Sequence, residues 1–200
     1  MNILDEFGDV VFAHRRDSGN CGYLVLQRGM LEAGVIDGET PMSTFRRGLF
    51  DHGSAYEEQF TGSTHTCIAV RRDGSAMYPP SYSRRGRAEV KRRQLFHRDV
   101  LQSIWTEGID FDNEVPQKFW MDAASVLPIA VHKYAIPRVV VYQLLSVTAS
   151  ARTCVVTIYS YENGKVVQRI QRGFEAPNSN DINIVLNPSA EFALLRVRHG

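Results

Sequence analysis

The side chains most suited to chemistry form a dense run of cations in the middle of the chain. Residues 61–100 carry nine Lys or Arg and three Asp or Glu, although the chain of 200 residues has a net charge of only +1. Arginine supplies most of these cations, and its guanidinium group forms paired hydrogen bonds to phosphate. The candidate nucleic-acid-binding residues are Arg84, Arg85, Arg87, Lys91, Arg92, Arg93 and Arg98, with Arg71 and Arg72 as an extension of the patch.

A basic helix over residues 84–107 would present these cations. Its apolar residues recur with the helical period at Phe96, Val100, Leu101, Ile104 and Trp105. The cations gather in its N-terminal half, which is the unfavourable end for the helix dipole. This placement favours an anionic partner from outside the helix. The alternative is a solvated face, or a face paired with acids of the same chain.

Two tyrosines and two prolines precede this helix. Pro79, Pro80 and Tyr82 match the P-P-x-Y motif that WW domains recognise, in a segment expected to be extended. Tyr78 and Tyr82 are candidates for stacking on the bases of a single-stranded RNA. The alternative interpretation of this segment is a structural linker.

The sequence pattern for a catalytic nucleophile is weaker than the pattern of cations. The three cysteines Cys21, Cys67 and Cys154 are far apart, and the sequence contains no G-x-S-x-G motif. The fold can bring any of these thiols to one of six histidines, so an enzyme with a Cys/His pair stays an alternative. The histidines are His14, His52, His65, His97, His132 and His199.

Metal and cofactor sites are not expected. His65 and Cys67 form the one close His/Cys pair, which falls short of the two pairs that a zinc site usually shows. Asp110, Asp112 and Glu114 alternate, and we interpret them as an exposed acidic loop, with a paired-acid or cation site as the alternative. Glycine-rich nucleotide-binding motifs do not occur.

The N-terminal part of the chain predicts strands and helices in alternation. Residues 9–15 and 21–27 have strand-like composition and are separated by turn residues, which indicates a hairpin. Residues 41–60 predict one or two short helices with Ser43 or Thr44 as the N-cap. Residues 64–71 predict another strand, and residues 116–126 a helix that begins with Pro116.

From residue 128 to residue 199 the sequence predicts an antiparallel β meander. Six runs rich in β-branched and aromatic residues are separated by turn residues, at a spacing typical of antiparallel sheets. Asn163-Gly164 is a strong signal for a type I′ hairpin turn. The six predicted strands are 129–134, 138–148, 153–161, 165–171, 181–186 and 191–198.

These elements predict a mainly β protein with helical insertions, of the α+β class. We expect an antiparallel sandwich, with a jelly roll as one form of it, in a single domain over residues 1–200. No apolar run reaches the ~18 residues of a membrane span, and the N-terminus lacks the pattern of a signal peptide. This predicts a cytoplasmic protein, in the cytoplasm or nucleus of the host if it is viral, that is not secreted.

The function predicted from the charge pattern is non-enzymatic nucleic-acid binding, with RNA phosphates held by the basic helix. A viral structural or accessory protein would fit this description. The first alternative is an assembly or adaptor module, similar to a coat or matrix subunit, whose partner is a second copy or a WW-domain protein. The second alternative is an enzyme with a Cys/His or paired-acid site.

Overall fold

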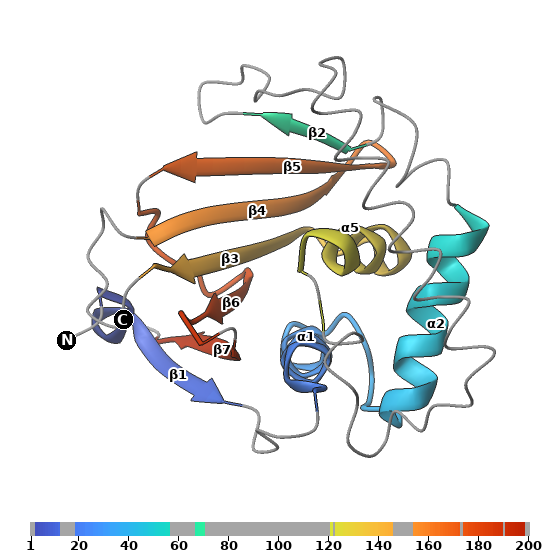
Figure 1. Cartoon of the computed structure of the whole chain (residues 1–200), viewed down its shortest axis with the longest axis horizontal. Coiled ribbons are helices and arrows are strands. Elements are labelled where there is room, and N and C mark those ends of the chain that lie inside the picture. Colours follow the sequence, from blue (N-terminus) through green and yellow to red (C-terminus); the bar gives the residue numbers. More distant parts are fainter. Residues whose placement is uncertain are drawn as a thin grey trace.

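The computed structural model describes residues 3–12, 19–56, 67–70, 121, 123–145, 154–172, 174–189 and 191–198. Within these ranges seven strands form one sheet, in the order β1-β7-β6-β3-β4-β5-β2 (Figure 1). The strands are β1 (Gly8–Phe12), β2 (Cys67–Val70), β3 (Arg138–Leu144), β4 (Cys154–Glu162), β5 (Lys165–Arg172), β6 (Ile182–Leu186) and β7 (Phe192–Val197). The helices are η1 (Ile3–Glu6), α1 (Cys21–Glu32), α2 (Met42–Ala55) and α5 (Ala123–Tyr134).

The sheet is open and mixed. Strand β3 runs parallel to β6 and β2 runs parallel to β5, while the other neighbours are antiparallel. The predicted α+β class is therefore confirmed. The predicted antiparallel sandwich and jelly roll are wrong, because the described strands make one sheet with helices packed on it.

Both faces of the central strands are buried. Val139 and Val141 of β3 face the larger apolar cluster, which includes the helices. Val140 and Tyr142 face a second cluster on the other side, closed by Leu4 and by Phe174. Burial on both faces explains why β3 has a continuous apolar run in the sequence instead of an alternating pattern.

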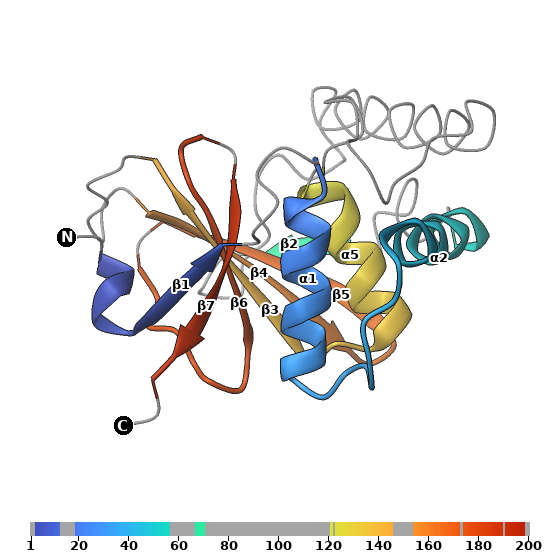
Figure 2. The ribbon, with the colours of Figure 1, turned by 90° about the horizontal axis from the view of Figure 1, so that it is seen from below.

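Helices α1 and α5 cover the same face of the sheet (Figure 2). Helix α1 packs on β6 and β7, and α5 packs on β3, β4 and β5. Helix α2 packs against α5 and α1, on the outside of the helical layer. This arrangement brings the C-terminal turn of α2 close to the C-terminal turn of α5, although about 80 residues separate them in the sequence.

The predicted strand 21–27 is wrong, because these residues form the first half of α1. The buried residues Tyr23, Leu26 and Met30 follow the helical spacing of three and four. Their β-like composition is overridden by packing on β6 and β7, and strand propensity depends strongly on such context. The predicted hairpin between 9–15 and 21–27 is lost with it, although β1 itself confirms a strand in the first segment.

The predicted strand 129–134 is also wrong, because these residues form the second half of α5. Residues 126, 127, 129, 130 and 131 are all buried. A helix that is apolar on every side has no amphipathic period, so its sequence is hard to distinguish from a buried strand. Pro128 lies inside the helix, where it removes one backbone hydrogen bond. The predicted helix 116–126 overlaps α5 only at its end.

The remaining described segments agree better with the sequence. Strands β2 to β7 fall within or close to predicted strands, and Asn163 and Gly164 have φ angles of 52° and 78°, as a type I′ turn requires. Helix α2 is a single helix that begins at Met42, so the predicted N-caps Ser43 and Thr44 lie inside it. None of the helices in the described ranges has the length and hydropathy of a transmembrane segment.

Candidate active site

Cys21 is the first residue of α1 and carries a free, half-buried thiol. The carbonyl of Asn20 accepts the first helical hydrogen bond from the Leu24 N–H, at 2.9 Å. The first N–H groups of a helix have no carbonyl partner within it, and the helix dipole adds partial positive charge there. The thiol therefore lies where backbone donors can stabilise negative charge on a bound group.

Asn20 does not use its side chain to cap this helix. Its Oδ1 instead accepts a hydrogen bond of 2.7 Å from Nη1 of Arg46, which lies on α2 and is fully buried. The guanidinium group also lies 4.1 Å above the centre of the Tyr23 ring. Burial lowers the pKa of Arg46, against a smaller opposing effect of Tyr23. The hydrogen bond between Asn20 and Arg46 thus joins the start of α1 to α2.

Gly22 allows close packing on the other side of Cys21. A Cβ atom at Gly22 would lie 2.8 Å from Cβ and Sδ of Met121 and 3.0 Å from the Phe192 ring. Only glycine leaves room for both neighbours in this position. The first turn of α1 is therefore held between α2 and the first residue of β7, which fixes the position of the thiol.

Cys154 has the opposite environment. It is buried in the second apolar cluster, and burial raises the pKa of its thiol to about 11. A thiol with such a pKa is almost entirely protonated at neutral pH and is a poor nucleophile. Of the two cysteines whose side chains the structure describes, Cys21 is the one suited to chemistry.

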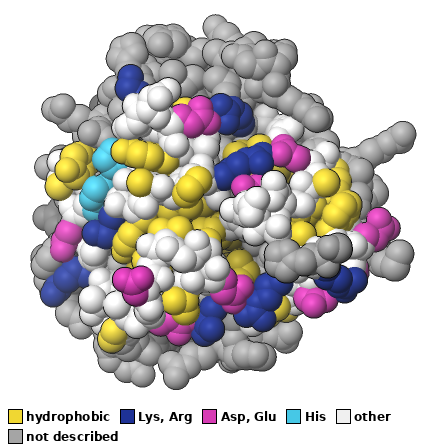
Figure 3. All heavy atoms as spheres, turned by 180° about the vertical axis from the view of Figure 1, so that it is seen from behind, with side chains coloured by type: hydrophobic (Ala, Val, Ile, Leu, Met, Phe, Trp, Pro, Cys, Tyr) yellow, Lys and Arg dark blue, Asp and Glu magenta, His cyan; other side chains and the backbone are white. Residues whose placement is uncertain are grey.

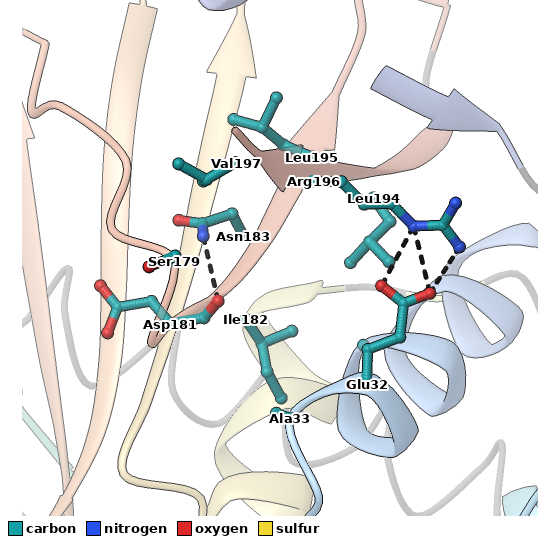
Figure 4. Close-up of a pocket in the computed structure, with 11 residues that line it drawn as sticks. Glu32, Ala33, Ser179, Asp181, Ile182, Asn183, Leu194, Leu195, Arg196 and Val197 are labelled. Carbon is teal, nitrogen blue, oxygen red and sulfur yellow. Dashed lines mark hydrogen bonds and ion pairs between the residues drawn. The ribbon is translucent and has the colours of Figure 1, made fainter. Parts of the chain in front are cut away.

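A separate cavity of about 260 Å³ lies where the end of α1 meets β6 and β7 (Figure 4). The pairing of β6 with β7 runs from Ile184↔Leu194 to Leu186↔Phe192, and the cavity lies beyond the end of this pairing. The Glu32 carboxylate and the Arg196 guanidinium form hydrogen bonds of 2.5–3.2 Å at its wall.

The amide of Asn183 also lines this cavity. Its Nδ2 donates to the carbonyls of Asn178 and Asp181, at 2.8 and 3.0 Å, and these two acceptors fix the orientation of the amide. Its buried Oδ1 has no hydrogen-bond partner among the described residues, and a single water molecule would supply one.

The cavity and the thiol lie at opposite ends of α1. Glu32 follows Cys21 by eleven positions, and a rise of 1.5 Å per residue places them about 16.5 Å apart along the helix axis. The cavity is therefore not the substrate pocket of Cys21, and the two regions are considered separately.

Most residues predicted to form a site lie outside the described ranges. These include the nine candidate phosphate-binding cations, Tyr78, Tyr82, the proline motif, the acidic loop and His65. The side chain of Cys67 is not described either. Among the predicted Cys/His candidates, His52 and His132 form a hydrogen bond with each other, at 2.8 Å. His14, His97 and His199 lie outside the described residues, so the Cys/His pair stays a prediction.

The position of Cys21 at a helix start was missed in the sequence. Asn20 is a residue type favoured just before a helix, and Tyr23, Leu26 and Met30 follow helical spacing. These two signals together would have placed the thiol at the helix start.

No family model matches the chain, and no curated protein matches it either. Among solved structures, the chain is similar to the structure of the Hazara virus OTU bound to ubiquitin. The identity is 11% and the TM-score 0.45, and the match covers 98% of this chain and 86% of that one.

This finding corrects the functional predictions from the sequence. The matched structure is that of a viral OTU bound to ubiquitin, and the predictions of non-enzymatic nucleic-acid binding and of nucleic acid as the partner are not retained. The second copy and the WW-domain protein are not retained as partners. An identity of 11% transfers no activity, so the chemistry of this chain rests on its own geometry.

Proposed function

We propose that the protein is an enzyme that uses the Cys21 thiol as a nucleophile in acyl transfer. The observation that carries this proposal is the position of a free, half-buried thiol at the first residue of α1, with no side-chain cap from Asn20. The anchoring of Asn20 by Arg46 and the close packing at Gly22 support it, because both hold the thiol in one position.

The reaction would proceed through an acyl-enzyme. The thiolate sulfur attacks the carbonyl carbon of an amide, isopeptide or ester, and the negative charge moves to the carbonyl oxygen. Backbone N–H groups in the first turn of α1 stabilise this oxyanion. A general base takes the proton of the thiol, and its conjugate acid then gives this proton to the departing amine or alcohol. Water hydrolyses the thioester at Cys21, which releases the carboxylic acid and restores the thiol.

The test compares cysteine variants on a panel of ester, peptide and isopeptide substrates. We expect Cys21→Ala and Cys21→Ser to lower kcat/KM by at least about a hundredfold, while Cys154→Ala retains activity. Iodoacetamide should alkylate Cys21 in the folded chain and leave Cys154 unmodified until the chain unfolds, as mass spectrometry would show. Far-ultraviolet circular dichroism verifies that each variant is folded.

A second set of variants locates the base. Each of the six histidines is replaced by Gln in turn. The variants at His52 and His132 should keep their activity, because these two side chains bond to each other. The variant at the histidine that pairs with Cys21 should lose it. Hydrolysis that persists in Cys21→Ala, or a Cys21 thiol that resists alkylation in the folded chain, would refute the proposal.

A further inference from the structure

Two histidines from different helices meet at the surface. His52 lies in the last turn of α2 and His132 in the last turn of α5, and Nε2 of His52 is 2.8 Å from Nδ1 of His132. Both side chains are half-buried. Histidine side chains reach the surface at one place in Figure 3, beside hydrophobic ones. The two described histidines therefore reach the surface of the molecule.

Aromatic rings surround this histidine pair. The Tyr56 ring centre lies 4.6 Å from that of His52 and 5.2 Å from that of His132. Tyr161 of β4 meets His132 edge to face, with centres 6.0 Å apart. Rings packed in this way limit the rotation of both imidazoles, so the two nitrogens are held toward each other before any ligand binds.

We propose that His52 and His132 form a two-residue binding site for a divalent transition metal of the zinc class. Imidazole nitrogen is a preferred ligand of Zn²⁺, Cu²⁺ and Ni²⁺, whereas Mg²⁺ and Ca²⁺ prefer oxygen. Such an ion would replace the hydrogen bond and would lie to one side of the line that joins the two nitrogens. The metal would link the end of α2 to the end of α5.

The spacing of the nitrogens is close to that of a metal site, and each imidazole would also turn so that its lone pair points to the ion. Two imidazole nitrogens on a tetrahedral zinc ion lie about 3.3 Å apart, given Zn–N bonds of about 2.0–2.1 Å. The nitrogens of His52 and His132 would need to separate by about 0.5 Å. The ring that now donates its proton would also move it to its other nitrogen, because only an unprotonated nitrogen binds metal.

The local electrostatics also suit a cation. Both histidines lie at the C-terminal ends of their helices, where the helix dipoles carry partial negative charge. Burial lowers the pKa of both imidazoles, and the charges of His132 and Lys133 further lower the pKa of His52, which favours the neutral form of both rings at pH 7.5. Lys133 is the opposing charge, and its Nζ lies 5.4 Å from the centre of the Tyr134 ring.

Two protein ligands leave the other coordination positions to water or to a bound group. No third His, Cys, Asp or Glu joins the pair within the part of the chain that the structure describes. An ion held by two side chains keeps exchangeable positions, in contrast to a closed structural zinc site. We therefore expect the metal ion to bind reversibly, and we expect this binding to require both histidines.

The experiment titrates ZnCl₂ into the full chain at pH 7.5 and measures binding by calorimetry and by the shift in Tm. Wild type should bind Zn²⁺ and gain thermal stability, while MgCl₂ has no effect. His52→Gln and His132→Gln should each weaken Zn²⁺ binding by at least about tenfold, since each removes one of two ligands. Cys21→Ala is the matched control and should bind as wild type does, which separates this site from the proposed nucleophile.

A chemical measurement tests the same site without substitution. Diethyl pyrocarbonate modifies accessible histidines, and Zn²⁺ should protect His52 and His132 in the wild-type chain while MgCl₂ does not. The proposal is overturned if Zn²⁺ binds equally well to both glutamine variants, if wild type shows no binding, or if neither histidine is protected. Each of these results would identify the pair as a hydrogen bond between helices and nothing more.

Discussion

Arg46 is the largest fully buried side chain in the described part of the chain. A buried guanidinium group is costly unless hydrogen bonds and nearby rings replace its hydration. Asn20 supplies a charge-assisted hydrogen bond of 2.7 Å, and the Tyr23 and Phe50 rings lie 4.1 and 6.0 Å from the guanidinium carbon. The residue before the proposed nucleophile thus stabilises the interior in addition to the helix start.

We expect Asn20→Ala to destabilise the protein by about 1–3 kcal/mol. The substitution removes an acceptor from a buried charged donor, and that loss exceeds the loss of a bond between neutral groups. Urea denaturation would measure the change in the free energy of unfolding. Asn20→Asp is the matched control, because a carboxylate of the same size keeps the acceptor and pairs with Arg46. Equal stability of the alanine and aspartate variants would contradict this account.

At the scale of single residues, the sequence offers candidates for chemistry but does not show which of them lie together. Cys21, His52 and His132 were all recognised as chemically capable in the sequence. Their arrangement was not, because the two histidines are 80 residues apart and meet only when α2 packs on α5. Sequence spacing predicts contacts within one element, whereas contacts between elements depend on packing that a single sequence does not specify.

The same distinction holds for whole elements. Strands β3 to β7 and the Asn163-Gly164 turn follow from local composition and turn chemistry. The sequence predicts strands for parts of α1 and α5, because their apolar residues are consecutive and buried on several sides. The wrong assignment of these two helices contributed to the predicted sandwich, since it added two strands and removed the two helices that cover one face of the sheet.

Helix α1 gives a prediction about close packing. We expect Gly22→Ala to destabilise the protein by about 1–3 kcal/mol, because its Cβ would overlap Met121 and Phe192 and force them to repack. Gly48→Ala in α2 is the matched control. Its Cβ would lie 3.8 Å from the Lys133 side chain, an ordinary contact, and alanine favours the helix by up to about 1 kcal/mol. Thermal or urea denaturation would measure both changes.

Opposite signs for these two substitutions are the expected result. A Gly22→Ala chain that is as stable as the Gly48→Ala chain would mean that the start of α1 is loosely packed. The fixed position of the Cys21 thiol would then lose its structural basis.

The β4–β5 turn gives a second prediction at this scale. Gly164 has a φ angle of 78°, so Gly164→Ala should cost about 1 kcal/mol in the free energy of unfolding. Gly38→Ala is the control, because its Cβ would enter open space and its φ angle is outside the left-handed region. Urea denaturation of both variants checks this difference, and a similar loss in both would contradict it.

At the scale of the whole molecule, one helix-covered sheet brings together three separate features. The thiol lies at the start of α1, the cavity at its end, and the histidine pair at the junction of α2 and α5. The thiol and the histidine pair depend on the packing of α2, through Arg46 and His52 respectively. A change that loosens α2 should therefore affect Cys21 reactivity and metal binding together, although the two sites lie apart on the helical layer.

The histidine pair predicts how the stability of the whole molecule changes with pH. Burial lowers the pKa of both imidazoles below 6.5, so below that pH the unfolded chain binds more protons than the folded chain. Stability contributed by the pair is complete above pH 6.5 and decreases as pH falls through the lowered pKa values.

Urea denaturation at pH 7 and pH 5 measures the stability that is lost between the two pH values. This loss should be smaller in the His52→Gln/His132→Gln chain than in wild type. Lys133→Gln should give an intermediate loss, because the charge of Lys133 contributes to the lowered pKa of His52. Equal losses in wild type and the double variant would mean that the two imidazoles titrate alike in the folded and unfolded chains.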